Sequence, residues 1–150
     1  NVISTVFEPR GARNVLPCWD EPGFKAQISL SIKHSIHYTA ISNMPVKENI
    51  KIDNETIWTI FQQSPPMSTY HLAIFLGIFD GMTNEFKNMT YWTQPDKLEY
   101  FEFTAEISPL IISALENYTD ICFSLPKLDS VHIPAYPAEA NEHWGAVTYS

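Results

Sequence analysis

The stretch YWTQPDKLEYFEFTAEISPLIISALENYTDICF, residues 91–123, marks a change in the pattern of the sequence. Before Pro95, apolar residues alternate with polar ones or form short runs, as in β-strands. After it, they recur at steps of three and four, as on one face of a helix. The helical spacing is carried by Ile107, Ile111, Leu115, Tyr118 and Cys122. We therefore predict a mixed α+β chain with a boundary near Pro95, which separates residues 1–94 from residues 95–150.

The helical part is open to two interpretations. Asp96 with Glu99 resembles a capping box at a helix start. Ser108-Pro109 resembles a second start, with Ser as the cap and Pro at the first helical position. Residues 97–123 therefore form either two short helices or one kinked helix.

The rest of the sequence predicts β-strands separated by turns. Residues 27–33 place Ile28, Leu30 and Ile32 on one face, as in a half-buried strand. Residues 70–79 are almost continuously apolar, as in a strand buried on both faces. The other predicted strands are 38–42, a hairpin of 49–52 with 56–61, then 87–93, 129–133 and 145–149, with a loop at 134–137.

Composition and charge exclude several classes of function. Hydrophobic residues make up 45% of the 150 residues, enough for a packed core. The formal charge is −8 and no Lys/Arg cluster is present, so no nucleic-acid interface is predicted. The acidic surface is expected mainly to confer solubility, although it also favours cationic ligands such as a free amine. No apolar run reaches the roughly 18–20 residues of a membrane span, so membrane attachment is expected only through segments outside this chain.

Three features bear on the compartment of the protein. The sequence begins at Asn1 without a signal-peptide pattern, and we expect it to be a segment of a longer chain. Cys18 and Cys122 are expected to be separate buried thiols, with pairing between them as an open alternative. Three glycosylation sequons favour an extracellular or plasma-membrane ectodomain. They begin at Asn54, Asn88 and Asn117.

Metal-binding and nucleophile motifs are missing from the sequence. It contains no H-E-x-x-H, no C-x-x-C and no G-x-S-x-G, so neither a zinc site nor a catalytic triad is predicted within it. His34 and His37 are an odd number of residues apart in a β-patterned stretch, so their side chains should point to opposite faces. The adjacent carboxylates Asp20 and Glu21 precede a proline and are expected to fix a turn or to pair with Arg10 or Arg13.

Several short stretches combine unusual residue types. FEPRGARNVLPCWDEPGFKA occupies residues 7–26, SNMP occupies 42–45 and MSTY occupies 67–70. LPKLD follows at 125–129, and EANEHWGAVTY at 139–149. Together they resemble the zinc aminopeptidase family typified by aminopeptidase N, the gluzincin aminopeptidases. The pattern of that family runs F-E-P-x-x-A-R-x-x-F-P-C-x-D-E-P-x-F-K-A, S-N-M-P, M-S-T-Y, P-L-P-K-L-D and G-A-M-E-N-W-G, in the same order and at similar intervals.

The resemblance covers essentially the whole chain and implies its organisation. Residues 1–94 would be the later part of an N-terminal β-domain, and residues 95–150 the first helix and strands of a thermolysin-like catalytic domain. The implied activity is that of a zinc metallo-aminopeptidase, which removes N-terminal amino acids from peptides. The zinc-binding H-E-x-x-H helix and a distal Glu are expected beyond Ser150, so the 150 residues alone are predicted to be inactive.

The resemblance also implies how a peptide with a free N-terminus is held. Glu142 matches the Glu of G-A-M-E-N, and Glu8 matches an acidic residue of the β-domain. Both would bind the α-ammonium, since carboxylates left unpaired by an internal amide favour a charged amine. Ala140 and Asn141 belong to the stretch that holds the substrate backbone. Val6 would line the first specificity pocket and make it more apolar.

Departures from the family pattern leave a second function open. Glu139, Asn141 and His143 replace the Gly, Met and Asn of G-A-M-E-N-W-G, and the T-R-P of the family is T-Q-P at residues 93–95. Glu139 places a side chain and a charge where Gly permits close backbone approach. The alternative is a catalytically weak or inactive homologue that acts as a binding or receptor ectodomain.

Overall fold

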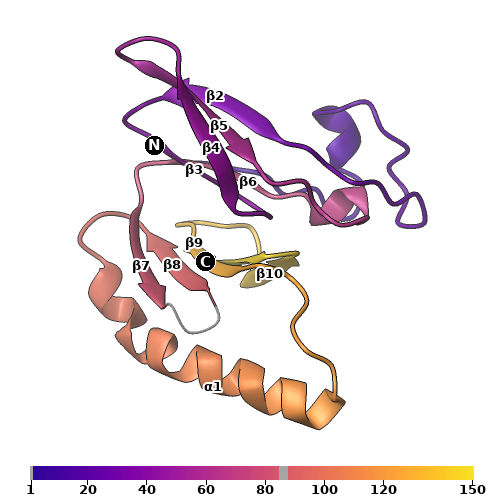
Figure 1. The fold of residues 1–150 in the computed structure, drawn as a ribbon, viewed down its shortest axis with the longest axis vertical. Coiled ribbons are helices and arrows are strands. Elements are labelled where there is room, and N and C mark those ends of the chain that lie inside the picture. The colour runs from indigo at the N-terminus through magenta and orange to yellow at the C-terminus, as the bar shows by residue number, and fades with distance from the viewer. Residues whose placement is uncertain (1, 85–87) are drawn as a thin grey trace.

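The computed structural model describes residues 2–84 and 88–150, whose strands form three sheets (Figure 1). Two antiparallel three-stranded sheets are built from the first 77 residues. One has the order β1 (Val2–Ser4), β6 (Ile74–Gly77) and β3 (Thr39–Ser42). The other has the order β2 (Ser31–Ser35), β5 (Thr56–Phe61) and β4 (Val46–Lys51).

The third sheet contains the C-terminal strands. Its order is β10 (Ala140–His143), β11 (Ala146–Tyr149), β9 (Leu128–His132), β8 (Met89–Thr93) and β7 (Asp80–Asn84). β9 is parallel to both of its neighbours, β11 and β8. The helix α1 (Glu102–Thr119) follows a short 3₁₀ helix, Leu98–Phe101, and runs along this sheet on the side away from the N-terminal sheets (Figure 1).

Strand pairing changes partner between β6 and β7. β7 and β8 precede Pro95, yet they belong to the same sheet as β9, β10 and β11. The sheets therefore divide earlier in the sequence than the predicted boundary near Pro95. The assignment of residues 1–94 and 95–150 to two domains stays a prediction.

A single continuous helix passes through Pro109, so the predicted second start at Ser108-Pro109 is wrong. The Ser108 hydroxyl donates to the Thr104 carbonyl at 2.7 Å inside the helix instead of capping a new one. Proline lacks an N–H and leaves the carbonyl of Ala105 without its usual donor. The side-chain amide of Asn84, in β7, donates to that carbonyl at 2.9 Å. This bond between distant segments replaces the missing helical one.

Both predicted ends of the helical region need correction. The helix ends at Thr119 rather than Phe123, because Asp120 adopts a left-handed conformation with φ of 55°. The capping box of Asp96 and Glu99 is wrong too, since neither the 3₁₀ helix nor α1 has a side-chain cap. The apolar spacing does not mark a wholly buried face either. Ile111, Leu115 and Tyr118 are among its exposed members.

Two predicted strands are shorter than expected. Within 27–33 only residues from Ser31 onward form a strand, although Ile28 and Leu30 are half-buried as the alternation requires. Within 70–79 only Ile74–Gly77 is a strand. The strand begins late because side chains bind the backbone of Ala73. The Ser42 hydroxyl donates to its carbonyl at 2.7 Å, and the side-chain oxygen Oδ1 of Asn43 accepts from its N–H at 2.9 Å.

The remaining strand predictions are largely confirmed. β3, the β4–β5 hairpin, β9 and β11 lie where expected within one to three residues, and 134–137 is a loop. β8 begins at Met89, while Lys87 of the predicted strand 87–93 lies outside the described residues. The short strands β1, β7 and β10 were not predicted, since none of them carries a marked apolar alternation.

Two buried clusters join the sheets. The larger one packs β3 and β6 against β9 and β11 and consists of Ile41, Ala73, Phe75, Phe79, Val131, Ile133, Tyr136 and Ala146. The smaller one joins the N-terminal turn to the segment that precedes β6 and consists of Phe7, Ala12, Met67 and Leu72, with Trp144 packed against it. The two N-terminal motifs and the C-terminal one therefore meet in one region.

Cys18 and Cys122 are both free thiols. Cys18 is half-buried and Cys122 is exposed, so the prediction of two buried thiols is wrong. In the described part of the chain, no helix is long and apolar enough to cross a membrane.

Candidate functional site

Glu142 lies on an edge strand. β10 pairs with β11 alone, in the register Asn141 to Thr148 and Glu142 to Val147. Ala140 and Glu142 are exposed, whereas Asn141 is 8% exposed. The free edge of such a strand offers backbone donors and acceptors to an extended peptide. Of the predicted residues, Ala140 and Glu142 therefore face outward, and Asn141 faces the interior.

Glu8 and Val6 lie in the turn after β1, and both are exposed. Phe7, between them, is 3% exposed and anchors the turn in the smaller cluster. The Gly11 N–H donates to the Phe7 carbonyl at 2.6 Å and closes the turn. A Cβ atom at Gly11 would lie 2.9 Å from the Val6 carbonyl oxygen, so glycine permits this close approach.

The charges of Glu8 and Glu142, which are far apart in the sequence, both affect the pKa of His71. Burial lowers the pKa of His71, while the backbone and charge of Glu142 and the charge of Glu8 raise it. Glu8 also raises the pKa of Tyr136, a change caused mainly by burial of the phenol. The pKa of His71 therefore responds to both carboxylates, and also to the charge of Lys25, which lowers it.

His71 and His143 are features of this region that sequence reasoning did not identify as functional. Burial lowers the pKa of His143 to about 4, and the charge of His71 contributes to this shift. The His71 ring lies 5.3 Å from Trp144, and the His143 ring lies 6.1 Å from Phe75, centroid to centroid. Nδ1 of His71 is buried without a hydrogen-bond partner among the described residues, while the backbone of His71 acts on the His143 ring and raises its pKa. Burial disfavours the charged form of both imidazoles.

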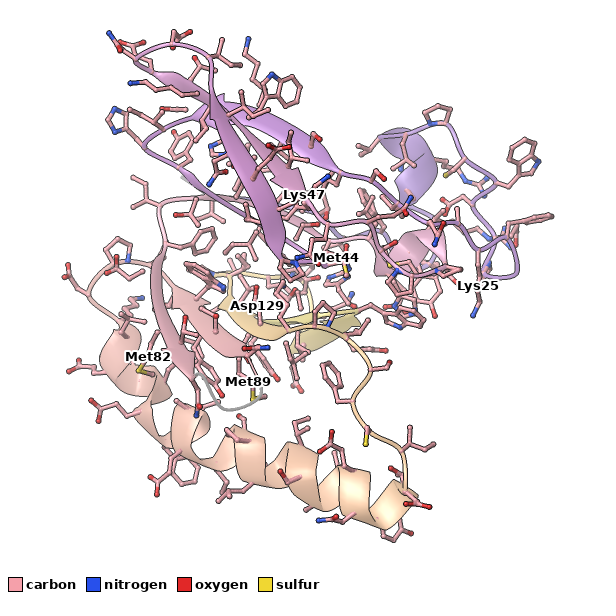
Figure 2. The ribbon with its side chains drawn as sticks, in the orientation of Figure 1. Lys25, Met44, Lys47, Met82, Met89 and Asp129 are labelled. Atoms are coloured by element: carbon pink, nitrogen blue, oxygen red, sulfur yellow. The ribbon has the colours of Figure 1, made fainter. Side chains whose placement is uncertain are left out.

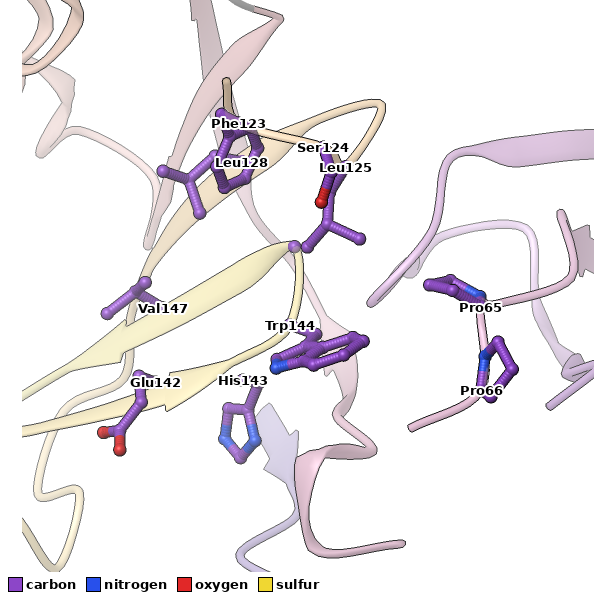
Figure 3. A pocket seen from close by; sticks show the side chains of 11 residues that line it. Pro65, Pro66, Phe123, Ser124, Leu125, Leu128, Glu142, His143, Trp144 and Val147 are labelled. Atoms are coloured by element: carbon purple, nitrogen blue, oxygen red, sulfur yellow. The ribbon is translucent and has the colours of Figure 1, made fainter. Parts of the chain in front are cut away.

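An open pocket of about 610 Å³ borders the edge strand (Figure 3). Glu142 and Val147 line it from the sheet, and Trp144 lies between this hairpin and the loop that holds Pro65 and Pro66 (Figure 3). Its other lining residues are mostly apolar: Phe123, Ser124, Leu125, Leu128, His143 and Gly145. One carboxylate beside an apolar surface suits a ligand with an amine and an apolar side chain.

The departures from the family pattern occupy different environments. The Glu139 side chain is exposed, while its carbonyl accepts from the Ser150 N–H at 3.1 Å. His143 is 3% exposed and faces the core. The charge at Glu139 therefore lies on the surface, and the substitution at His143 changes the interior behind Glu142.

Asp20 and Glu21 are structural, as predicted. Asp20 is 3% exposed and accepts from the Thr69 hydroxyl at 2.6 Å and from Arg13 Nε at 3.3 Å. The Thr69 hydrogen bond is the largest cause that lowers the pKa of Asp20. Glu21 pairs with Arg10 at 3.4 Å on the surface. The acidic pair therefore ties the first motif to MSTY.

The described residues do not fit a zinc ion. Within residues 2–84 and 88–150, no three His, Cys, Asp or Glu side chains converge as metal ligands would. His34 is buried and bonded to the Ser35 carbonyl at 2.8 Å and the Thr59 hydroxyl at 2.7 Å, whereas His37 is exposed. The prediction that they point to opposite faces of one strand is wrong, since β2 ends at Ser35 and His37 lies in the turn that follows.

Comparison with known proteins agrees with the resemblance that the sequence motifs indicated. Residues 1–71 match the family described as the Peptidase M1 N-terminal domain. The whole chain is similar to bovine glutamyl aminopeptidase, with 39% identity over 152 residues. It is also similar to aminopeptidase A of the viper Gloydius brevicauda, with 38% identity over 151 residues, and to rice aminopeptidase M1-C, with 40% over 153. Each alignment covers 99% of this chain.

These matches define the class and then the family. The first 71 residues carry the sequence of the N-terminal domain of a peptidase family. The chain belongs to the M1 family of peptidases, and the relatives named above are aminopeptidases. It spans about a sixth of the length of these curated relatives, 16% of the bovine one.

Proposed function

We propose that this chain is the part of a zinc-dependent aminopeptidase that binds the free N-terminus of a peptide. The observation that carries the proposal is that Phe7, next to Glu8, and Trp144, two residues after Glu142, pack in the same cluster, although the two carboxylates are 134 positions apart in the sequence. In the proposal, the two carboxylates bind the α-ammonium, and the free edge of β10 at Ala140 and Asn141 aligns the peptide backbone. The exposed Val6 provides apolar contact for the first side chain.

The catalytic metal is part of the proposal but not of this chain. Zinc would supply an activated water for attack on the peptide carbonyl. Its ligands are proposed to lie beyond Ser150, in the thermolysin-like domain that residues 95–150 begin. The residues described here bind and orient the substrate, and the 150 residues alone are expected to cleave nothing.

The full-length protein is expected to release amino acids from chromogenic aminoacyl amides, and a chelator should stop the release. Glu142→Gln should raise KM, lower kcat and reduce kcat/KM by about 30-fold, close to 2 kcal/mol, since it removes one charge-assisted bond to the ammonium. Steady-state kinetics measures both effects.

The matched control is Glu139→Gln, three residues away on the same surface. This change removes the same charge from an exposed side chain that the proposal leaves out of the site, so kcat/KM should stay within about twofold. Equal losses in both variants would reduce Glu142 to a general contribution of negative charge. Release that persists in the presence of chelator would contradict a zinc enzyme.

The second candidate function is a binding ectodomain with little or no catalysis. His143 favours it, because a histidine replaces the Asn of the family pattern directly behind Glu142. A wild-type protein that binds peptides with a free N-terminus but releases no product would support this candidate. Loss of the same binding in Glu142→Gln would show that the anchor is retained.

An extracellular or plasma-membrane location is proposed on the basis of the three sequons. Their asparagines can be ranked by how accessible each side chain is in the structure. Asn54 is exposed in the β4–β5 turn, whereas the Asn88 side-chain amide donates to the Pro126 carbonyl at 3.2 Å. Asn117 is exposed on α1. We expect peptide mapping after deglycosylation of the secreted protein to find Asn54 modified and Asn88 unmodified. An unmodified Asn54 in that sample would contradict the ranking.

A further inference from the structure

The turn between β10 and β11 lies directly against the N-terminal sheets. Gly145 in this turn has φ of 75°. A Cβ atom at Gly145 would lie 2.1 Å from the carbonyl oxygen of Asn43. The backbone of the turn therefore contacts the backbone of the SNMP segment without room for a side chain.

Asn43 binds this turn from the N-terminal side. It is 2% exposed. Its side-chain nitrogen Nδ2 donates to the Trp144 carbonyl at 2.8 Å and to the His71 carbonyl at 2.7 Å. Its side-chain oxygen Oδ1 accepts from the Ala73 N–H at 2.9 Å. One buried side chain thus connects the turn after β10 to both ends of the segment that enters β6.

Lys127 binds the same turn from the other side. Its ammonium donates to the Gly145 carbonyl at 2.9 Å, to the Ser42 carbonyl at 2.8 Å and to Asp129 at 2.7 Å. An ammonium has three donors, so all are used. Asp129, in β9, lies where the five-stranded sheet meets the segment that holds Met44 (Figure 2). One small cavity is lined by Lys127, Asp129, Ser42 and Met44.

The Lys127–Asp129 ion pair is a poor candidate for net stabilisation. The two side chains are 12% and 5% exposed. Burial lowers the pKa of Lys127 and raises the pKa of Asp129, which shows that desolvation opposes both charges. Replacing such a pair by uncharged groups is often neutral or stabilising. The bonds from Lys127 to two backbone carbonyls therefore call for a role in geometry.

From these contacts we propose that Asn43 and Lys127 are positioning residues. They fix the β10–β11 turn on the N-terminal sheets and thereby hold Glu142 in place relative to Glu8. Among the described strands β10 is paired with β11 only, so the turn at Gly145 is one of the constraints on where its last residues lie. The inference rests on the proposed function for its effect on substrate, but the effect on the turn does not depend on it.

The test is the double variant Lys127→Met/Asp129→Asn in the full-length protein. It removes the ion pair without leaving a buried charge, and it removes both carbonyl bonds to the turn. Lys33→Met is the control, because it removes an ammonium from an exposed side chain of β2 and leaves the Lys127–Asp129 pair intact. Asn43→Ala is a second variant that acts on the turn from the other side.

Hydrogen exchange and kinetics are measured on the same samples. In the double variant and in Asn43→Ala, amides of residues 140–149 should exchange about tenfold faster while those of the β4–β5 hairpin keep their rate. KM should rise about tenfold with kcat within about threefold, whereas the control should resemble the wild type.

The outcomes separate this inference from the proposed function. Unchanged exchange at residues 140–149 in both variants overturns the inference. Faster exchange with unchanged KM overturns it too, since the turn would then not position the anchor. A wild-type protein without activity contradicts the proposed aminopeptidase, and the exchange rates then decide alone whether Asn43 and Lys127 hold the turn.

Discussion

Gly145→Ala should lower the free energy of unfolding by about 3 kcal/mol or more. A non-glycine residue at a positive φ costs about 1–2 kcal/mol. The new Cβ atom would also lie 2.1 Å from the Asn43 carbonyl oxygen, a backbone atom that cannot rotate away. The turn or the SNMP segment must therefore shift, which weakens the bonds of Asn43 and Lys127. Urea unfolding followed by tryptophan fluorescence measures the change.

Gly23→Ala is the matched control for this prediction. A Cβ atom at Gly23 would meet nothing within 4 Å, and the residue is exposed. This variant should unfold within about 0.5 kcal/mol of the wild type. Equal midpoints for Gly145→Ala and Gly23→Ala would show that the turn adapts freely, and the close contact at Asn43 would then carry no structural weight.

Acidification between pH 6.5 and pH 4 should destabilise the protein through His143 by about 3 kcal/mol. The pKa of His143 falls from an ordinary 6.5 to about 4 in the folded protein. In this window the unfolded chain binds a proton that the folded chain does not, so stability is fully present above pH 6.5 and lost as the pH falls towards 4. Thermal midpoints measured across this range report the slope.

The comparison variant for the pH effect is His143→Asn, the residue of the family pattern. It removes the titrating group, so the midpoint should depend less steeply on pH between 6.5 and 4 than in the wild type. His37→Asn, at an exposed turn position, should keep the wild-type slope. An identical slope in His143→Asn would assign the effect to other groups. His71 and His132, whose pKa values burial also lowers, are the first to consider.

The sequence pattern predicted the structure correctly where the contacts of a segment are with residues nearby in the sequence. The β4–β5 hairpin was predicted, and so was a turn or a pairing with Arg10 or Arg13 for Asp20 and Glu21, because all these partners are close in the sequence. The helix was located but its interior was misread at Pro109. The hydrogen bond that replaces the missing helical one comes from Asn84, 21 residues before Ala105, whose carbonyl accepts it. Nothing in the local sequence indicates such a partner.

The candidate site shows the same limit. Motif matching identified Glu8 and Glu142, but no periodicity predicted that the His71 ring would lie 5.3 Å from the ring of Trp144, two residues after Glu142. β10 was missed because its residues, Ala-Asn-Glu-His, lack the apolar alternation of a half-buried strand. The register that places Glu142 outward is set by β11 and by the turn at Gly145. These constraints are tertiary, and a single sequence does not display them.

The contacts of Asn43 have a consequence for how this family diverges. Its amide binds the carbonyl groups of His71 and Trp144, and every residue type supplies a carbonyl. Substitution at position 71 therefore leaves these bonds intact as long as Asn43 and Gly145 persist. A lineage can exchange the side chains around Glu142 while the backbone that presents this residue keeps its shape. Residues that differ from the family pattern at positions 139, 141 and 143 are thus a weaker sign of lost function than a change at Asn43 or Gly145 would be.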